Sequence, residues 1–278
     1  MKPLDLLYFY RLLNWKHKIS SIRPLGFAVF GYIWAGKFEA IPLIANTIAV
    51  FGAILFWFSI NDYSDLNSPK EESFMKTLIK TGKLTRERAL TLCLLPLILT
   101  PIVIFTSSKP AILIFTVILF LNFFYSAGPL RLKSHKYLWV AEAVLAAPLL
   151  FLESYIIRGS ISTLPILMAV ILALFYFYTG IIHILEDFQT GEKVQKIPQP
   201  LALKLLKVMP LISLIVSLVF SPFFPIFLIT AFFSIIRIIS LKNFKPDQVQ
   251  KTRRNLFSPQ LSLYEFAAYA LIAITGQG

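Results

Sequence analysis

Residues 41–72 read IPLIANTIAVFGAILFWFSINDYSDLNSPKEE, an apolar run of twenty residues followed at once by a polar stretch rich in acids. An α-helix needs about 20 apolar residues to cross the roughly 30 Å hydrocarbon layer of a bilayer. Ionisable side chains at the mouth of such a helix are costly unless a cation meets them, which makes them candidate site residues. We therefore expect a membrane helix over 41–60 that leads into a functional polar segment.

A second polar stretch, HILEDFQTGEK at residues 183–193, follows another long apolar run in the same way. Together the two stretches contain seven of the fourteen aspartates and glutamates of the chain. If the helices bring them to one side of the membrane, their carboxylates can share a cation. We expect the two stretches to face each other and to hold a diphosphate through Mg²⁺.

The composition is that of an integral membrane protein. Of 278 residues, 57% are hydrophobic and only 15% are charged, and several apolar runs have the length of a bilayer span. The net charge of +13 does not indicate nucleic-acid binding, because the basic residues lie beside the apolar runs and not on a separate polar domain. The single cysteine, Cys93, excludes an internal disulfide, and the N-terminal residues show no cleavable signal peptide.

The apolar runs predict an all-α bundle of nine transmembrane helices, a single domain over residues 1–278 around a central cavity with cytoplasmic cap loops. The opening segment mixes aromatic and basic residues, so we expect a short interfacial helix before the first span. Pro96 and Pro101 fall inside one predicted span, where neighbouring helices can satisfy the freed carbonyls. The predicted spans are 19–35, 41–60, 89–106, 111–125, 137–157, 164–185, 201–220, a helix from the Pro222–Pro225 turn to Leu241, and 261–274.

The distribution of lysine and arginine sets the expected orientation. With the N-terminus in the cytoplasm, every one of the 27 basic residues except Lys37, Lys109 and Arg158 lies in a cytoplasmic segment. Membrane proteins concentrate basic residues on their cytoplasmic side. The pattern predicts a cell-membrane protein with a cytoplasmic N-terminus, an outer C-terminus, and both acidic stretches on the cytoplasmic face, where they can form one site.

The spacing within the first acidic stretch suits metal ligands. If the helix over 41–60 continues for one turn, Asn61 and Asp65 lie four residues apart on the same face. Their oxygen atoms suit Mg²⁺, which takes few protein ligands and completes its shell with phosphate and water. The alternative is a solvated cap at a helix end, a place that Asn and Asp favour for their own hydrogen bonds. From the spacing alone, both interpretations stay open.

Several short motifs accompany the predicted helices: Arg23-Pro24 near the start of the first span, Asn61-Asp62-x-x-Asp65 with the later Gly82-Lys83-Leu84-Thr85, and Tyr125-Ser126-x-x-Pro129-Leu130-Arg131-Leu132-Lys133. Together with the nine predicted helices, they resemble the UbiA superfamily of intramembrane prenyltransferases, and the resemblance spans nearly the whole chain. The chain departs from the family pattern at Pro69 and Gly191, where the family usually has aspartate.

The resemblance implies Mg²⁺-dependent transfer of a prenyl group from a polyprenyl diphosphate to a small aromatic or lipid acceptor within the membrane. In that mechanism, Mg²⁺ and basic side chains neutralise the leaving diphosphate, and the acceptor captures the allylic cation. The implied catalytic residues are Asp65, Asp187 and Lys133. The implied metal ligands are Asn61, Asp62, Asp65, Asp187 and Glu192, the implied substrate contacts are Arg23, Asn61, Lys70, Tyr125, Arg131, Lys133 and Glu142, and His183 and Glu186 are further candidates.

The predicted span over 137–157 carries two glutamates. Glu142 and Glu153 are about three helical turns apart, so they share a face, and acids within membrane helices usually point into the bundle. We expect Glu142 to reach the acceptor and Glu153 to be structural. Aromatic side chains near the predicted loops can shield a cation, although core packing or an interfacial belt is the simpler interpretation for each of Phe123, Phe124, Tyr125, Tyr176 and Tyr178.

Two other functions fit the same sequence. A terpene cyclase on the same scaffold quenches the cation internally, and product analysis with geranylgeranyl diphosphate in the absence of an acceptor separates it from a transferase. A non-catalytic or transport protein that keeps the fold is favoured somewhat by Pro69 and Gly191. A transporter is expected to show paired repeats with interrupted helices, and the sequence shows no clear internal repeat.

Overall fold

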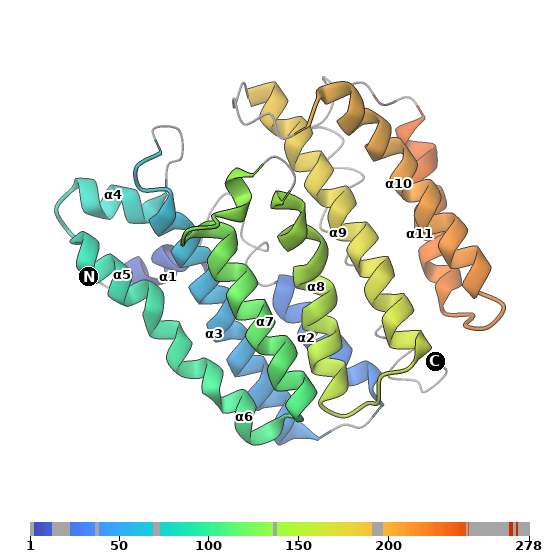
Figure 1. The fold of residues 1–278 in the computed structure, drawn as a ribbon, viewed down its shortest axis with the longest axis horizontal. Helices are drawn as coiled ribbons and strands as arrows, with labels where there is room; N and C mark the ends of the chain where they lie inside the picture. The colour runs from blue at the N-terminus through green and yellow to red at the C-terminus, as the bar shows by residue number, and fades with distance from the viewer. Residues whose placement is uncertain are drawn as a thin grey trace. The chain divides into compact units, whose positions relative to one another are not determined.

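The computed structural model describes residues 3–12, 23–36, 39–68, 73–135, 138–190, 197–242, 244, 267–268 and 271 (Figure 1). The regular elements within these ranges are all helical, which confirms the all-α prediction. The elements are α1 (Pro3–Phe9), α2 (Arg23–Trp34), α3 (Ala40–Ser64), α4 (Phe74–Lys80), α5 (Arg86–Leu94), the 3₁₀-helix η1 (Leu95–Ile102), α6 (Val103–Thr106), α7 (Lys109–Ser126), the 3₁₀-helix η2 (Leu132–Ser134), α8 (Trp139–Ile156), α9 (Thr163–Thr190), α10 (Gln199–Phe220) and α11 (Phe227–Leu241).

Five helical segments of the described chain are long and apolar enough to cross a membrane: Ala40–Ser64, Arg86–Thr106, Lys109–Ser126, Thr163–Ile182 and Gln199–Phe220. Three further apolar helices are shorter, at Pro24–Trp34, Val144–Ile156 and Phe227–Leu241. The predicted span at 261–274 lies outside the described residues except for Ala267, Ala268 and Leu271. A helical membrane protein is therefore supported, and the count of nine spans stays a prediction.

The acidic stretches are more helical than the sequence suggested. α3 continues through Ser64, whose hydroxyl donates to the Ile60 carbonyl at 2.7 Å, and the backbone N–H of Asp65 closes the helix on the Asn61 carbonyl at 3.2 Å. α9 likewise runs on to Thr190, so assigning residues 186–190 to a loop was wrong. The polar residues stay helical because each backbone N–H still finds a carbonyl one turn back.

Prolines and a serine cap explain two further differences. The predicted span over 89–106 is one rod, but its centre at Leu95–Ile102 is 3₁₀, because Pro96 and Pro101 supply no N–H to an α-helical ladder. The segment between α3 and α5, which no predicted span covers, contains the short helix α4. Its N-cap is Ser73, whose hydroxyl accepts a hydrogen bond from the backbone N–H of Lys76 at 3.2 Å.

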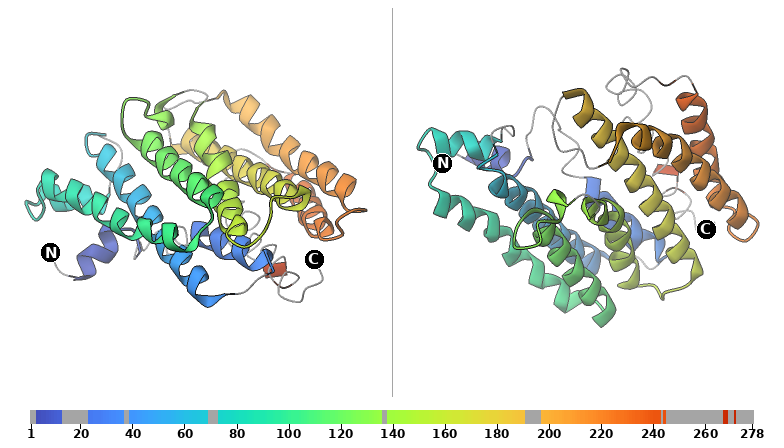
Figure 2. Two further views of the ribbon diagram at one scale, coloured as in Figure 1. Left: turned by 60° about the horizontal axis from the view of Figure 1, so that its bottom comes forward. Right: turned by 45° about the horizontal axis from the view of Figure 1, so that its top comes forward.

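The chain packs into two compact units: residues 1–133 with 149–160, called unit 1, and residues 134–148 with 161–278, called unit 2. Within unit 1, α3 contacts α2, α4, α5, η1, α6 and α7, so it is the central helix of that unit. In unit 2, α10 packs along both α9 and α11, and the two views of Figure 2 keep α10 and α11 side by side. The prediction of one domain over the whole chain remains a prediction.

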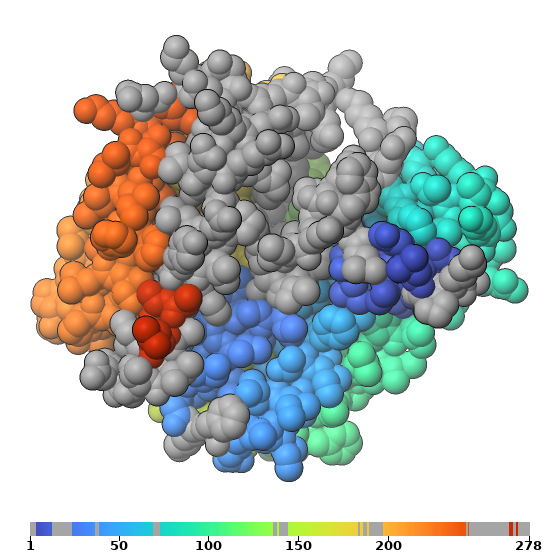
Figure 3. Space-filling view, turned by 180° about the vertical axis from the view of Figure 1, so that it is seen from behind, coloured from blue at the N-terminus to red at the C-terminus, as the bar shows by residue number. Residues whose placement is uncertain are grey.

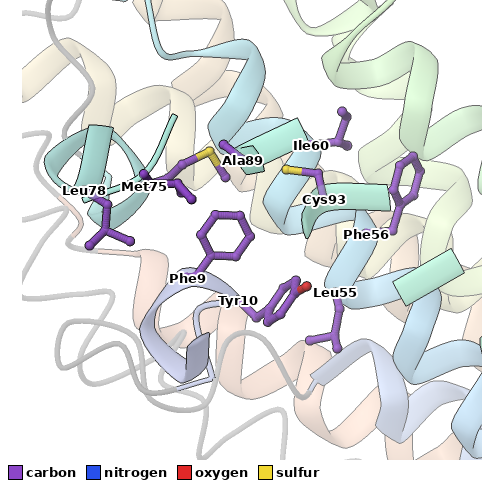
Figure 4. Close-up of a cluster of buried hydrophobic side chains, with 10 residues drawn as sticks. Phe9, Tyr10, Leu55, Phe56, Ile60, Met75, Leu78, Ala89 and Cys93 are labelled. Atoms are coloured by element: carbon purple, nitrogen blue, oxygen red, sulfur yellow. The ribbon is translucent and has the colours of Figure 1, made fainter. Parts of the chain in front are cut away.

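The core of unit 1 surrounds the cytoplasmic end predicted for α3. Side chains from α1, α3, α4 and α5 meet there (Figure 4), and they include Phe9, Leu55, Phe56, Ile60, Met75, Leu78, Ala89 and Cys93, all buried. The hydroxyl of Tyr10 donates to the Leu92 carbonyl at 2.7 Å. Burial raises the pKa of Tyr10 to about 12, so this hydroxyl keeps its proton.

The short N-terminal helix expected from the sequence is present as α1, which lies next to α4 on the face shown in Figure 3. The rings of Tyr8 and Phe74 pack with their centroids 5.3 Å apart. This contact holds α1 against α4 within unit 1. The segment after α1 then lies at the polar end of α3.

Two glycines allow close helix packing in unit 1. A Cβ on Gly31 of α2 would lie 2.2 Å from the Phe151 carbonyl oxygen of α8, and one on Gly52 of α3 would lie 2.7 Å from the Pro96 carbonyl oxygen. Membrane helices use small residues at such contacts because van der Waals packing drives their association. The first approach positions α2 against α8, and the second positions α3 against η1.

Candidate functional site

The polar end of α3 presents Asn61 and Asp65 on one side of the helix, as their spacing predicted. Asn61 is half-buried, and Asp65, the C-cap residue, is only 6% exposed. A carboxylate this buried needs a positive partner, because transferring an unpaired charge out of water is costly. The structure supplies that partner from the segment that follows α7.

Two basic side chains converge on this pair. Lys133 Nζ donates to Asp65 Oδ2 at 2.5 Å and to Asn61 Oδ1 at 2.8 Å. Arg131 Nη2 donates to Asp65 Oδ1 at 2.9 Å, and the hydroxyl of Ser126 donates to Asn61 Oδ1 at 3.0 Å. We call these five residues the Asp65 cluster. It joins segments 65 to 72 residues apart in sequence.

The turn after α7 places the two bases. α7 ends at Ser126, and Gly128 adopts a φ of +71°, a conformation that L side chains rarely take. A Cβ at Gly128 would also lie 3.0 Å from the Phe123 ring. The chain thus turns sharply back, and Arg131, itself at a φ of +32°, and η2 return toward the end of α3.

The charges of the Asp65 cluster do not cancel. Counted over the described residues, one carboxylate meets two cations, which gives the Asp65 cluster a net charge of +1. Lys133 is 14% exposed and Arg131 is 46% exposed, so the lysine charge is the more desolvated. Such a cluster favours an anion, and Arg and Lys both pair well with phosphate oxygens.

A pocket of about 430 Å³ adjoins the Asp65 cluster within unit 1, a size within the range of small-molecule sites. Ser126 and Arg131 belong to both the pocket wall and the cluster. Arg86 adds a second guanidinium, whose Nη2 donates to Asn67 Oδ1 at 2.9 Å. The remaining wall is formed by Ile60, Tyr63, Ser64, Leu66, Leu90, Phe123, Ala127 and Gly128.

Asp62 has a different partner. Its carboxylate pairs with the guanidinium of Arg11, which follows α1, through both Nε (3.1 Å) and Nη2. Asp62 is 4% exposed, so its carboxylate is shielded from water, whereas the Arg11 side chain is 32% exposed. The family resemblance implied that Asp62 is a metal ligand, and the sequence did not predict its pairing with Arg11. The only indication of a basic partner was the general need of a buried acid for a base.

The other predicted site residues fall into three groups. The side chain of Tyr125 is described and is half-buried near the end of α7. Arg23, Glu142 and Asp187 lie in α2, α8 and α9, and for these three the structure describes the backbone but not the side chain. The same holds for His183 and Glu186 in α9, whereas Lys70 and Glu192 lie outside the described residues. Among the side chains that are described, no group of three His, Cys, Asp or Glu could hold a metal ion. The meeting of the two acidic stretches thus remains a prediction.

Solved structures of other proteins share the fold of this chain. No protein-family model and no curated protein matches the sequence. A solved structure from work on digeranylgeranylglyceryl phosphate synthase in membranes matches at a TM-score of 0.73, with 16% identity over 98% of each chain.

Two UbiA homologues match in the same way. One, from Archaeoglobus fulgidus and bound to GPP and Mg²⁺, has a TM-score of 0.71 and 17% identity, with 98% of this chain and 99% of that chain covered. An apo homologue from Aeropyrum pernix K1 has a TM-score of 0.63 and 14% identity, with 94% of this chain and 96% of that chain covered. The chain therefore has the fold of UbiA homologues over nearly its whole length, as its motifs predicted.

Proposed function

We propose that this chain is a Mg²⁺-dependent prenyltransferase of the UbiA superfamily, which transfers the prenyl group of an isoprenoid diphosphate to an acceptor within the membrane. The observation that carries the proposal is the Asp65 cluster, in which a buried carboxylate pairs with two cations and a half-buried amide accepts from one of them, at the end of an apolar helix. The fold supports it, because a homologue of the same fold is bound to GPP and Mg²⁺.

The residues of the cluster fit a magnesium ion. Asn61 and Asp65 offer hard oxygen atoms from adjacent turns of α3, and Mg²⁺ needs only one or two protein carboxylates beside phosphate and water. The proposed ligands are Asn61, Asp65 and Asp187, with Asp62 and Glu192 as further predicted contributors. When bound, the ion would neutralise charge on the diphosphate oxygens.

Lys133 and Arg131 are the proposed diphosphate contacts of the chain. Each already donates to Asp65 at a charge-assisted distance, so its nitrogen lies within reach of an anion at this position. Arg131 keeps further N–H groups for a second acceptor because a guanidinium has five donors. Neutralising the departing diphosphate favours cleavage of the C–O bond toward an allylic cation.

The acceptor is proposed to be a small aromatic molecule or a lipid. The remaining predicted substrate contacts are Arg23, Lys70, Tyr125 and Glu142. The orientation expected from the basic residues puts the N-terminus and the Asp65 cluster on the cytoplasmic side of the cell membrane.

The test is turnover of geranylgeranyl diphosphate by the purified protein in lipid nanodiscs, with and without Mg²⁺. We expect Asp65→Asn and Asp187→Asn to lower diphosphate release by about 100-fold or more, the usual cost of removing one strong stabiliser of developing charge. Lys80→Met is the control, because Lys80 is exposed at the end of α4 and belongs to neither the Asp65 cluster nor the pocket wall. Full turnover in both aspartate variants would refute the proposed site.

The products distinguish the alternatives. Prenylated product that requires an added phenolic or lipid acceptor supports a transferase. A cyclised hydrocarbon formed without any acceptor indicates a terpene cyclase on this scaffold. Binding of the diphosphate with no turnover under any condition indicates a non-catalytic protein.

A further inference from the structure

Glu153 of α8 is an acid inside an apolar helix and far from the Asp65 cluster. It is 0% exposed, and its surroundings in unit 1 contain two other buried polar side chains, Asn46 (1%) and Ser154 (0%). Asn46 lies on α3 fifteen residues before Asn61, which is about 22 Å along a helix. The group therefore plays no part in the proposed transfer reaction.

The three side chains are linked by two hydrogen bonds. Asn46 Nδ2 donates to Ser154 Oγ at 2.7 Å, and Ser154 Oγ donates to Glu153 Oε2 at 2.8 Å. The serine hydroxyl thus uses its donor and one acceptor position. Among the described residues, two buried atoms of the same group have no hydrogen-bond partner, namely Glu153 Oε1 and Asn46 Oδ1.

Both of these atoms are acceptors if Glu153 is ionised. An acceptor pair with no donor leaves two buried polar atoms unsatisfied, which destabilises the folded protein. An ionised carboxylate would also need a cation. The basic group one turn further along this segment, Arg158, donates to the Tyr32 hydroxyl at 3.2 Å and pairs with Glu39. Its charge is already compensated, so it does not serve Glu153.

We propose that Glu153 and Asn46 form a proton-binding site inside the membrane, with one proton held on Glu153 Oε1 and donated to Asn46 Oδ1. A single proton satisfies both atoms and removes the buried charge. The hydrogen bonds then form a closed ring, in which Asn46 donates to Ser154, Ser154 to Glu153 and Glu153 to Asn46. The neutral acid links α8 to α3, and the ring bonds reinforce one another in a medium of low dielectric constant.

A metal ion such as Na⁺ is the competing occupant, because the same two oxygen atoms could contact it. The structure favours the proton for two reasons. Na⁺ prefers more oxygen ligands than this group offers, since Ser154 Oγ already donates to Glu153 Oε2 and accepts from Asn46. A proton needs only one donor atom and one acceptor atom, which are the two atoms without partners.

The test is infrared difference spectroscopy of the whole protein in lipid, comparing the wild type with Glu153→Gln at pH 7. We expect a carboxylic-acid C=O band in the wild type that is absent from the variant. Glu87→Gln, a change at an exposed glutamate of α5, should leave this band unchanged. The absence of any band that depends on Glu153 would overturn the proposal.

Thermal stability gives an independent readout. The amide of Glu153→Gln can donate to Asn46 and accept from Ser154 as the neutral acid does, so its midpoint should stay near that of the wild type. Glu153→Ala should lower the midpoint by several degrees because it breaks the ring. A Gln variant as unstable as the Ala variant, or a wild-type midpoint that depends on Na⁺ while that of the Gln variant does not, would show that the site holds no proton.

Discussion

Replacing Lys133 with methionine keeps most of the apolar stem and removes the ammonium group from the Asp65 cluster. In the wild type, that group donates to both Asp65 and Asn61, and both side chains lose this partner in the variant. Arg131 remains beside the carboxylate, but its side chain is 46% exposed, so water weakens its pairing. The variant thus retains a buried carboxylate with reduced compensation.

The magnitude follows from this geometry. Removing one partner of a buried ion pair costs about 3–5 kcal/mol when the other charge is left unpaired. Because Arg131 stays, we expect a smaller loss of about 1.5–3 kcal/mol, the range for hydrogen bonds to charged groups. For a protein slightly smaller than this chain, 1 kcal/mol shifts the midpoint by about 2–4 °C, so a fall of about 3–12 °C is expected.

Cys93 provides the assay. It is the single cysteine of the chain and is fully buried in unit 1, so a thiol-reactive dye should label it only as unit 1 unfolds. The midpoint of labelling during heating is measured for the wild type, Lys133→Met, Asp65→Asn and the double variant. Lys83→Met controls for the loss of a lysine at an exposed position.

The double variant decides the matter. Once Asp65→Asn has removed the carboxylate, the loss of Lys133 no longer leaves a charge uncompensated, so the double variant should be more stable than the sum of the single changes predicts. A coupling of about 0.5–3 kcal/mol is expected for side chains in direct contact. Additive losses within about 0.5 kcal/mol would refute the ion pair and, with it, the geometry of the proposed site.

Three further predictions use the same labelling assay. Arg11→Met should destabilise unit 1 by about 1–3 kcal/mol and more than Arg11→Lys, since lysine keeps a charge for Asp62 but not the paired contact; equal stability of the two variants would contradict this. Gly31→Ala should cost about 1–3 kcal/mol or more because its Cβ meets the Phe151 carbonyl oxygen, and an unchanged midpoint would place α2 elsewhere. Geranyl diphosphate with Mg²⁺ should raise the midpoint, because at a hundredfold excess over Kd it increases the free energy of unfolding by about 2.7 kcal/mol, and EDTA or Asp65→Asn should abolish the rise.

Much of the fold could be predicted from sequence because membrane helices depend on two local properties, length and hydropathy. The apolar runs therefore located α3, α7 and α10 within a few residues of their observed ends. The ends in polar sequence were less predictable. In α3 and α9 the backbone ladder continues into residues that usually favour turns, and hydropathy carries no information about that choice.

The candidate site shows the same division between local and long-range information. The spacing of Asn61 and Asp65 fixed their shared face, and the bases of the loop after α7 were expected near them. The contact of Lys133 with both residues could not be predicted locally, because it depends on the turn at Gly128 and on the packing of α7 against α3. The pairing of Arg11 with Asp62 joins residues 51 apart, and no local pattern indicates it.

The two acids of the Asn-Asp-x-x-Asp motif have separate roles in this structure. Residues three apart on a helix are offset by about 60° around its axis, so their side chains can reach different neighbours. Here the Asp62 carboxylate pairs with Arg11, while the Asp65 carboxylate pairs with Lys133 and Arg131. Asp62 and its arginine are balanced, and they fix the segment after α1 to α3. Asp65 is outnumbered by its cations, so an arriving diphosphate can take over their positive charge without leaving either base unpaired. The same exchange would free the Asp65 oxygen atoms at the position where the proposed metal binds. Replacing Asp62 should therefore lower the stability of the fold more than it lowers the affinity for diphosphate. Replacing Asp65 should lower the affinity for diphosphate even in molecules that remain folded.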